Sequence, residues 1–313
     1  MLGYIFRRIL ATIPVMGVVA LIVFFLLRLS TGDPAAIMAG DAATAEQLED
    51  MRRQMGLDQP IIVQFVVWLG HLLTGDFGIS LHSKVPVMDM IASRLGPSLA
   101  LATLTIILSI IVAVPLGVLA AWSHRTLMDQ LVMGIGVLSF SVPIFVMGYA
   151  LIFLLSVKLG LFPVQGYKPL ASGIGPFLHN LVLPTIALSS IYIAQIARIT
   201  RSSLLDVMGE DFIRTARAKG LKESTVFLRH GLRNAAVPIV TVIGIGAAFL
   251  IGGVVVTESV FNIPGLGRMV VEAVLARDYP LIQGLILVLS LAYVLINLIV
   301  DLLYTVLDPR IRY

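Results

Sequence analysis

The residues best suited to a chemical task in this sequence are the charged side chains between Arg198 and Arg233, a segment called the polar loop below. It holds eight Lys or Arg and four Asp or Glu, while the sequence on both sides is apolar. Its middle part, from Glu210 to Gly220, reads Glu-Asp-Phe-Ile-Arg-Thr-Ala-Arg-Ala-Lys-Gly. Interspersed charges of both signs suit ion pairs across a protein interface. The polar loop is therefore predicted to bind another polypeptide.

The spacing of apolar residues predicts two helices in the polar loop. From Ser202 to Lys219 these residues recur at helical intervals, so we expect one amphipathic helix that continues from the apolar segment before it. They are Leu204, Leu205, Met208, Phe212 and Ala216. Gly220 is predicted to end this helix, and a second helix is predicted to start at Lys222. Two short helices joined at a glycine form a compact knob that a groove on a soluble partner can hold.

Membrane anchoring is the alternative role for the polar loop, since each Lys or Arg near anionic lipid gains about 1 kcal/mol. Four acidic residues among the bases weaken this alternative. For Lys219, a pair with a carboxylate of the partner and an extension toward the membrane surface both stay open. His230 is interpreted as a helix-end or packing residue rather than a switch.

The elements that must position the polar loop are membrane helices. Of the 313 residues 58% are hydrophobic and 13% charged, with a mean hydropathy of +0.99. Soluble domains are about a quarter charged, so an all-α polytopic membrane protein is expected. The net charge of +4 is small and clusters in loops, which indicates membrane orientation rather than nucleic-acid binding. Without cysteine there are no disulfides or thiolate metal sites, and no metal site is expected.

Six segments are long and apolar enough to cross about 30 Å of hydrocarbon. They are Ile9–Leu27, Ser98–Trp122, Leu131–Val157, Phe177–Ala197, Ala235–Thr257 and Leu281–Val300. None contains Asp, Glu, Lys or Arg. Prolines inside them are interpreted as kinks in a packed bundle: Pro14, Pro115, Pro143, Pro184 and Pro238. The first segment is interpreted as an uncleaved span, because its apolar run is longer than that of a signal peptide.

Charge distribution supports six spans rather than seven. The apolar stretch Ile61–Leu73 is short for a span and is interpreted as an interfacial or re-entrant helix. With six spans, 13 of the 22 basic residues and seven of the 18 acidic ones lie on the side of the polar loop. The positive-inside rule then places the polar loop and both termini in the cytoplasm.

Residues 31–95 are too long for a simple connector and are expected to form a helical extracytoplasmic insertion. Thr44 and Gln47 have the spacing of a capping box, ahead of a predicted helix Gln47–Met55 that Gly56 ends. The predicted organisation is an N-terminal transmembrane helix (1–30), this insertion, and a core of five spans (96–313). Whether the insertion only packs or also docks an external partner stays open.

The polar loop resembles the cytoplasmic EAA loop of bacterial ABC importer permeases, the surface on which an ATPase acts. The run Arg-Thr-Ala-Arg-Ala-Lys-Gly from Arg214, with Arg233-Asn-Ala after it, is typical of the dipeptide, oligopeptide and nickel branch. The Glu and the closing Pro of the general pattern are absent here. Further pieces from end to end of the chain resemble the same branch: Gly32-Asp33-Pro34, Gly56–Pro60, Gly75–Gly78, Thr200–Ser203, Phe261–Arg268, Arg277–Pro280 and Asp308–Arg312.

The resemblance implies the type I ABC importer transmembrane fold and a place in the bacterial inner membrane, among lipid. The implied partners are a homologous second permease, two ATP-binding subunits and an extracytoplasmic solute-binding protein, with no nucleic acid. The chain itself is not expected to be an enzyme or to hold a cofactor, since ATP and Mg belong to the partner ATPases. The residues implied to couple to the ATPase are Glu210, Asp211, Arg214, Thr215, Ala216, Arg217, Ala218, Lys219 and Gly220.

The sequence also bears on the energy source and the pathway. No Gly-x4-Gly-Lys-Ser/Thr phosphate loop occurs, so ATP would be hydrolysed on a partner. The spans lack ionisable residues, which disfavours proton coupling, although a sodium site built from carbonyls stays open.

Candidate pathway residues are Ser139, Ser141, Ser189, Tyr192, Gln195, Thr241 and Glu258. Each hydroxyl can instead serve helix packing, and Glu258 either meets the positive end of a peptide or pairs with Arg268.

The expected function is ATP-driven, binding-protein-dependent import of short peptides, with this chain forming half of the pore. Glutathione, nickel or another solute of the same branch are the alternative cargoes. An ion-coupled secondary transporter, an intramembrane hydrolase and a membrane scaffold are alternatives of other classes. The hydrolase would need a Ser–His or paired Asp arrangement, and only His179 approaches a span.

Overall fold

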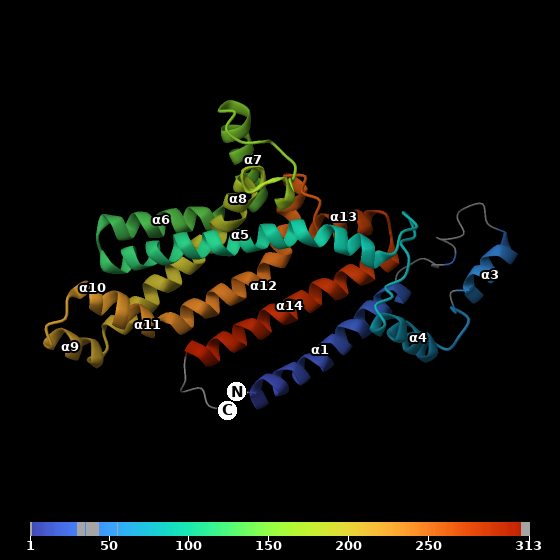
Figure 1. Cartoon of the computed structure of the whole chain (residues 1–313), viewed down its shortest axis with the longest axis horizontal. Coiled ribbons are helices and arrows are strands. Elements are labelled where there is room, and N and C mark those ends of the chain that lie inside the picture. Colours follow the sequence, from blue (N-terminus) through green and yellow to red (C-terminus); the bar gives the residue numbers. More distant parts are fainter. Residues whose placement is uncertain (1, 30–34, 36–43, 55, 308–313) are drawn as a thin grey trace. The chain divides into compact units, whose positions relative to one another are not determined.

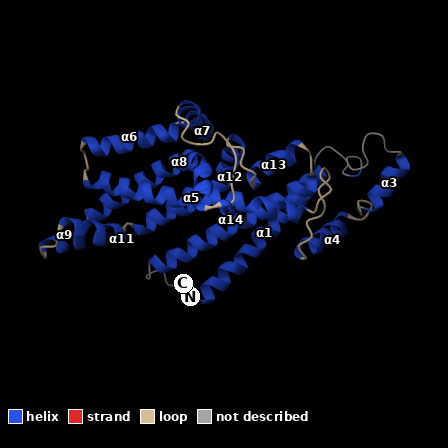
Figure 2. Ribbon diagram, turned by 45° about the horizontal axis from the view of Figure 1, so that its top comes forward, coloured by secondary structure: helices blue, strands red, loops and turns tan. Residues whose placement is uncertain are grey.

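The computed structural model describes residues 2–29, 35, 44–54 and 56–307, and these residues are built almost wholly from helices (Figure 2). A single isolated bridge joins Ile79 and Pro86 within the described ranges. The helices are α1 (Leu2–Leu29), α3 (Ala45–Gln54), α4 (Ile61–Leu73), α5 (Val87–Trp122), α6 (Leu127–Ser141), α7 (Ile144–Leu151), η1 (Ile152–Lys158), η2 (Leu170–Ser172), α8 (Ile174–Met208), α9 (Asp211–Ala218), α10 (Glu223–Thr225), η3 (Val226–Gly231), α11 (Leu232–Asn234), α12 (Ala236–Val260), α13 (Leu266–Leu275) and α14 (Tyr279–Leu307).

The chain forms two compact units. One comprises Met1–Leu95 with Met269–Val294, and the other comprises Gly96–Arg268 with Leu295–Tyr313. The second unit contains the polar loop and is called the core unit below; the first is called the flanking unit.

Five helices are long and apolar enough to cross a membrane: α1, α5, α8, α12 and α14. Each matches one of the predicted spans. A sixth crossing results if α6 and the following segment Ile144–Lys158 are taken together, but the two are bent by 102°. The all-α polytopic fold is thus confirmed, with one difference in the third span.

The third predicted span, Leu131–Val157, is a broken helix rather than a kinked one. The break lies at Val142 and Pro143, where Val142 has an extended backbone with φ −92° and ψ 121°. Proline lacks the N–H of the helical bond and disfavours helical geometry in the residue before it, so α6 ends there. Figure 1 shows α7 turning away from the direction of α6.

In the core unit α8 lies at the centre, in contact with α6, α7 and α12. Its apolar residues join a core with residues of α5 and α12, among them Leu101, Leu188 and Val254. Close approach depends on glycine: a Cβ on Gly117 of α5 would lie 2.6 Å from the Ala197 carbonyl oxygen of α8. Small residues at helix contacts are typical of membrane bundles.

The flanking unit packs α1 against α4 through aromatic rings. The Phe24 ring lies 5.1 Å from that of Phe65 and 5.5 Å from that of Trp68. Within the same unit the buried carboxylate of Asp278 accepts bonds from the Ser80 hydroxyl and from the Leu81 N–H at 3.1 Å. These contacts fix the segment that leads into α14.

Two local predictions in the flanking unit are confirmed. The Thr44 N–H bonds to Gln47 Oε1 at 2.9 Å, and the Gln47 N–H bonds back to Thr44 Oγ1 at 3.3 Å. This capping box precedes α3, which begins at Ala45, and Gly56 follows with φ +64°. The short apolar helix is α4, with the predicted bounds Ile61–Leu73.

Replacement of Gly117 by Ala is expected to lower the free energy of unfolding by about 1–3 kcal/mol, because the added methyl overpacks the contact of α5 with α8. Thermal unfolding of the purified protein in detergent measures this. Gly134→Ala on α6 is the matched control, since its Cβ meets nothing within 4 Å. Equal melting temperatures for the two variants would contradict the assignment of Gly117 to a tight contact.

Candidate functional site in the polar loop and the helices that carry it

The first part of the polar loop is two helices rather than one. The predicted single helix from Ser202 to Lys219 is wrong, because α8 ends at Met208 and α9 begins at Asp211. Between them Glu210 is extended, with φ −73° and ψ 151°. Gly209 and Glu210 interrupt the helix at the start of the run Glu210–Gly220.

The break also changes which residues of α9 are buried. Ile213 and Ala216 are buried against Val226, with Val207 and Met208 packed beside them. Phe212, which continuous helical spacing would place on the buried side, is exposed instead. Ala216, one of the expected coupling residues, therefore lies on the inner face of α9 and holds the loop together.

The turn at Gly220 is confirmed. This glycine has φ +74°, a conformation open to glycine at little cost, and its N–H bonds to the Arg217 carbonyl at 2.9 Å. A second helical stretch then starts at Glu223, as predicted, and runs through α10, the π-helical η3 and α11. The knob predicted from the sequence is thus present, with both helices packed together.

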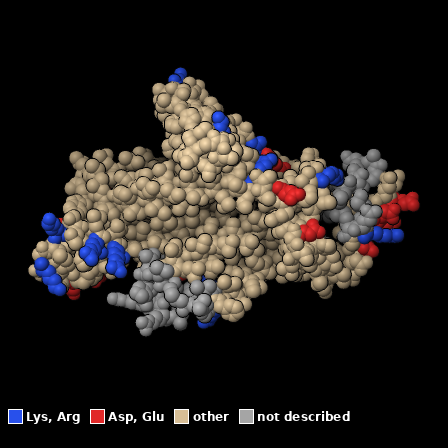
Figure 3. Space-filling model, in the orientation of Figure 1, with Lys and Arg blue, Asp and Glu red and all other residues tan. Residues whose placement is uncertain are grey.

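The outer face of α9 is charged and exposed. Arg214 pairs with Asp211 at 3.2 Å, and the Arg217 guanidinium bonds to both carboxylate oxygens of Glu223, the shorter contact being 2.7 Å. Lys219 has no ion-pair partner among the described residues. Figure 3 shows Lys and Arg side chains gathered over the end that carries α9 and α11. The remaining expected coupling residues Glu210, Thr215, Ala218 and Gly220 are exposed as well.

The polar loop is firmly joined to three long helices of the core unit. The Phe227 ring lies 4.8 Å from the Trp122 ring at the end of α5. Leu204 of α8 and Ile239 of α12 complete the same buried cluster with Phe227. A Cβ on Gly231 would lie 3.2 Å from the Met208 sulfur, so the return of the loop also packs closely on α8. The loop and these helix ends form one packed body.

Most hydroxyls expected along the pathway bond to their own helix. Ser141 donates to the Val137 carbonyl at 2.9 Å, Ser189 to Ile186 at 3.1 Å, and Thr241 to Val237 at 2.7 Å. Such bonds satisfy a hydroxyl in an apolar surrounding. Tyr192 is buried with its ring against Gly246, and Ser139 is half-buried. These arrangements support the packing alternative for Ser189, Tyr192 and Thr241.

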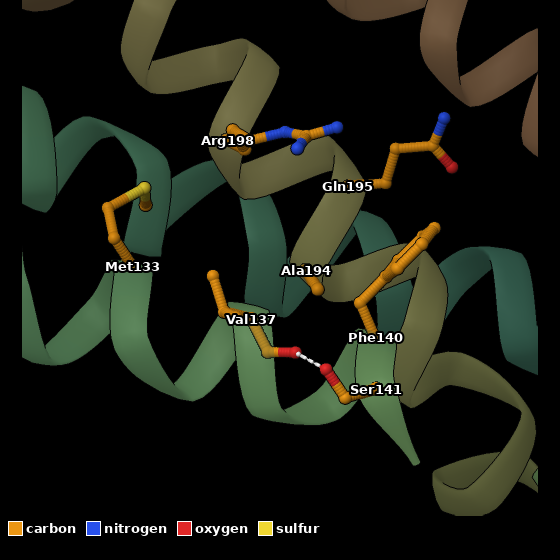
Figure 4. A pocket seen from close by; sticks show the side chains of 8 residues that line it. Met133, Val137, Phe140, Ser141, Ala194, Gln195 and Arg198 are labelled. Atoms are coloured by element: carbon orange, nitrogen blue, oxygen red, sulfur yellow. Dashed lines mark hydrogen bonds between the residues drawn. The ribbon is translucent and has the colours of Figure 1, made fainter. Parts of the chain in front are cut away.

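One cavity brings expected pathway residues together. It has a volume of about 230 Å³ and lies between α6 and α8, with Gln195 and Ser141 in its wall (Figure 4). Phe140 and Val137 give it an apolar side, and Arg198 lies on the same side as Gln195. Neither the Arg198 guanidinium nor the Gln195 amide has a hydrogen-bond partner among the described residues. Sequence reasoning assigned Arg198 to the polar loop and missed its place in this cavity.

Glu258 is fully buried and organises a turn. Its carboxylate accepts bonds from the Ser98 hydroxyl and from the Arg268 N–H, the latter at 2.9 Å. The Ser98 oxygen in turn accepts the Leu266 N–H at 2.7 Å. A Cβ on Gly265 would lie 1.9 Å from Glu258 Oε1, so the turn closes tightly over the carboxylate. Of the two expected roles, the geometry supports contact with Arg268, whose N–H bonds to the carboxylate, rather than contact with cargo.

Replacement of Glu258 by Gln is expected to lower the free energy of unfolding by about 1.5–3 kcal/mol, because one accepting oxygen becomes a donor within a closed turn. Ser98→Ala should lower it in the same direction, and thermal unfolding measures both. Ser259→Ala is the control, since that exposed hydroxyl bonds only to Val255 of its own helix. A wild-type melting temperature for Glu258→Gln, together with weaker cargo binding, would reverse the assignment.

Comparison with known proteins places this geometry in a family. A family model described as binding-protein-dependent transport system inner membrane component matches residues 113–313, and its N-terminal companion matches residues 1–102. The chain is similar to a probable peptide ABC transporter permease protein, y4tP, of Sinorhizobium fredii, with 50% identity over 99% of both chains. It is also similar to the glutathione transport system permease protein GsiC of Escherichia coli K12, with 44% identity over the full length of both.

Among solved structures, an inward-facing form of the MetNI methionine ABC transporter has a similar fold, with a TM-score of 0.59 at 18% identity. The likeness covers 71% of this chain and 97% of that chain. With its membrane-crossing helices and its match to both family models, the chain belongs to the binding-protein-dependent transport system inner membrane components.

Proposed function

We propose that this chain is a permease subunit of an ATP-driven importer of short peptides, and that it forms half of the translocation pore. The observation that carries the proposal is the polar loop: its outer face is charged and exposed, while its inner face is packed on the ends of α5, α8 and α12. A partner that moves this loop would move the helices with it.

The partner proposed for the loop is a cytoplasmic ATPase. The knob of α9 and η3 has the size and shape for a helix-in-groove contact, and Lys219 offers a cation for a carboxylate on the partner. Arg214 and Arg217 are in exposed pairs, which contribute little to stability and can exchange partners readily. The proposed orientation has the loop and both termini in the cytoplasm.

The remaining partners follow the family's binding-protein dependence. We propose a second homologous permease, two ATP-binding subunits that hold ATP and Mg, and an external binding protein. Residues 31–95, which include α3 and α4, are proposed to form the extracytoplasmic insertion near that protein. The mechanism is alternating access: ATP binding favours one state of the pore and hydrolysis restores the other. A swing from 1:99 to 99:1 between two states needs about 5.5 kcal/mol of differential binding.

Short peptides are the proposed cargo. One relative is named as a probable peptide permease and the other as a glutathione permease, and glutathione is itself a tripeptide. Glutathione therefore remains the alternative within the same chemical class. We further propose that the cavity between α6 and α8 lies on the pathway, with Arg198 taking the carboxylate of the peptide and Gln195 an amide.

Reversal of two charges on the loop, Arg214→Glu with Lys219→Glu, is expected to lower uptake at least tenfold and to abolish co-purification with the ATPase. The amount of chain in the membrane should not change, because both side chains are exposed and such substitutions rarely alter stability by more than about 0.5 kcal/mol. Lys168→Glu, at an exposed position between η1 and α8, is the control. Uptake by this chain alone in vesicles would sink the proposal and favour a secondary transporter.

Replacement of Arg198 by Gln is expected to weaken binding of a short peptide at least tenfold, since a charge-assisted hydrogen bond contributes about 1.5–3 kcal/mol. Equilibrium binding of radiolabelled peptide to the purified transporter, without its external binding protein, measures the effect. A peptide with an amidated C-terminus should bind both forms alike. Ser202→Ala on the same helix is the control, because its hydroxyl bonds only to Ile199. Equal peptide affinities for wild type and Arg198→Gln would remove the cavity from the pathway.

A further inference from the structure

An ion pair with a buried carboxylate joins α6 to α8 at the start of the polar loop. Asp129, in the first turn of α6, is 3% exposed. Its two carboxylate oxygens accept two bonds from Arg201 of α8, from Nε to Oδ1 at 2.5 Å and from Nη2 to Oδ2 at 2.7 Å. Such two-point contacts fix orientation as well as distance.

The turn between α5 and α6 completes the surroundings of this carboxylate. The Arg125 N–H donates to Asp129 Oδ2 at 3.0 Å, from a residue with φ +65°. His124 Nδ1 lies 3.5 Å from the same oxygen and 3.1 Å from Arg201 Nη2. Among the described residues, the polar contacts of Asp129 therefore come from its own turn or from Arg201, and the arginine connects it to α8.

Elsewhere α6 and α8 meet mainly through small and apolar side chains. A Cβ added to Gly136 would lie 3.7 Å from the Ala194 methyl, and both residues lie in the wall of the cavity that Met133 and Val137 also line. Apolar contacts are not directional, so they hold two helices in one register less tightly than a two-point ion pair does. Among the described residues, the ion pair of Asp129 and Arg201 is the hydrogen-bonded contact between the two helices.

The pair connects the part of the polar loop that belongs to α8 with α6, the helix that leads to the broken span. Arg201 is about two helical turns before the end of α8, and the next turn carries Leu204, on which the loop packs. At its other end α6 stops at Val142 and Pro143, after which α7 packs against α8 and α12. A displacement of the loop-bearing end of α8 reaches this break through Asp129.

We propose that Asp129 and Arg201 are positioning residues that make α6 move together with the loop-bearing end of α8. Motion of the polar loop then changes the angle between α6 and α7. This inference rests on the proposed contact of the loop with an ATPase. The pair is suited to the task because a slipped register would leave the buried Asp129 carboxylate without its partner, which is strongly unfavourable.

The test measures how many ATP molecules the reconstituted transporter, with its binding protein, hydrolyses for each peptide imported. Asp129→Asn is expected to raise this ratio at least tenfold, with ATP hydrolysis retained and peptide uptake lowered. The double variant Asp129→Asn with Arg201→Gln should raise the ratio by a similar factor. It leaves no unpaired charge at this site, so the amount of chain in the membrane is expected to equal that of the wild type. Arg125→Gln is the matched control: it removes a charge from the same turn but keeps the backbone N–H bond to Asp129.

A distance measurement separates motion from mere folding. The chain has no cysteine, so spin labels at Leu138→Cys and Asp206→Cys report the distance from α6 to the end of α8 in a complex with cysteine-free partners. A narrow distance distribution is expected in the wild-type background with and without ATP, and a broad one in the double variant.

The outcomes separate two failures. If the wild-type chain does not bind an ATPase, the proposed function itself fails. If the wild-type chain does bind an ATPase, two results overturn only the role of Asp129 and Arg201. One is a wild-type ratio of ATP hydrolysed to peptide imported in the double variant, and the other is a narrow distance distribution in that variant. Failure of the double variant to reach the membrane, or an equal loss of coupling in Arg125→Gln, also overturns it.

Discussion

The structure depends most on the burial of the inner face of the polar loop against the end of α8. Ile213, Ala216 and Val226 form this face, and the cluster around Leu204 and Phe227 continues it onto α5 and α12. Packed interiors transmit displacement because they contain few voids. A charged connector of the same composition without this apolar inner face would follow the motion of a partner without displacing the helices.

The sequence predicted the long helices and their ends well, because these follow from local rules. Apolar length defines the spans, and the capping box at Thr44 and the turn at Gly220 need only a few neighbouring residues. The two breaks, at Val142–Pro143 and Gly209–Glu210, were not predicted. A proline inside a span is compatible with a mild kink or with a full break, and only packing of the surrounding helices decides between them.

The candidate site was predictable as a charged surface but not as a set of contacts. Charge spacing predicted a binding surface at the residues of α9, yet it gave no sign that Ala216 lies on the inner side. Glu258 looked like a residue that meets cargo, whereas its carboxylate closes a turn with Ser98, 160 residues away in sequence. Nothing in the sequence indicated that Asp129 pairs with Arg201, because an acidic residue just outside an apolar segment is usually a solvated loop residue. Partners distant in sequence are set by tertiary packing.

The sharp bend after α6 has a consequence for what surrounds it. The last carbonyl groups of a helix have no donor within that helix, and hydrocarbon supplies none. At the bend, the Ser141 hydroxyl donates to the Val137 carbonyl. Pro143 has no N–H and so donates no backbone hydrogen bond to a carbonyl of α6. Lipid tails alone are therefore a poor neighbour for this corner. The corner therefore favours a polar neighbour such as headgroups, solvent or protein when the chain is embedded in a bilayer.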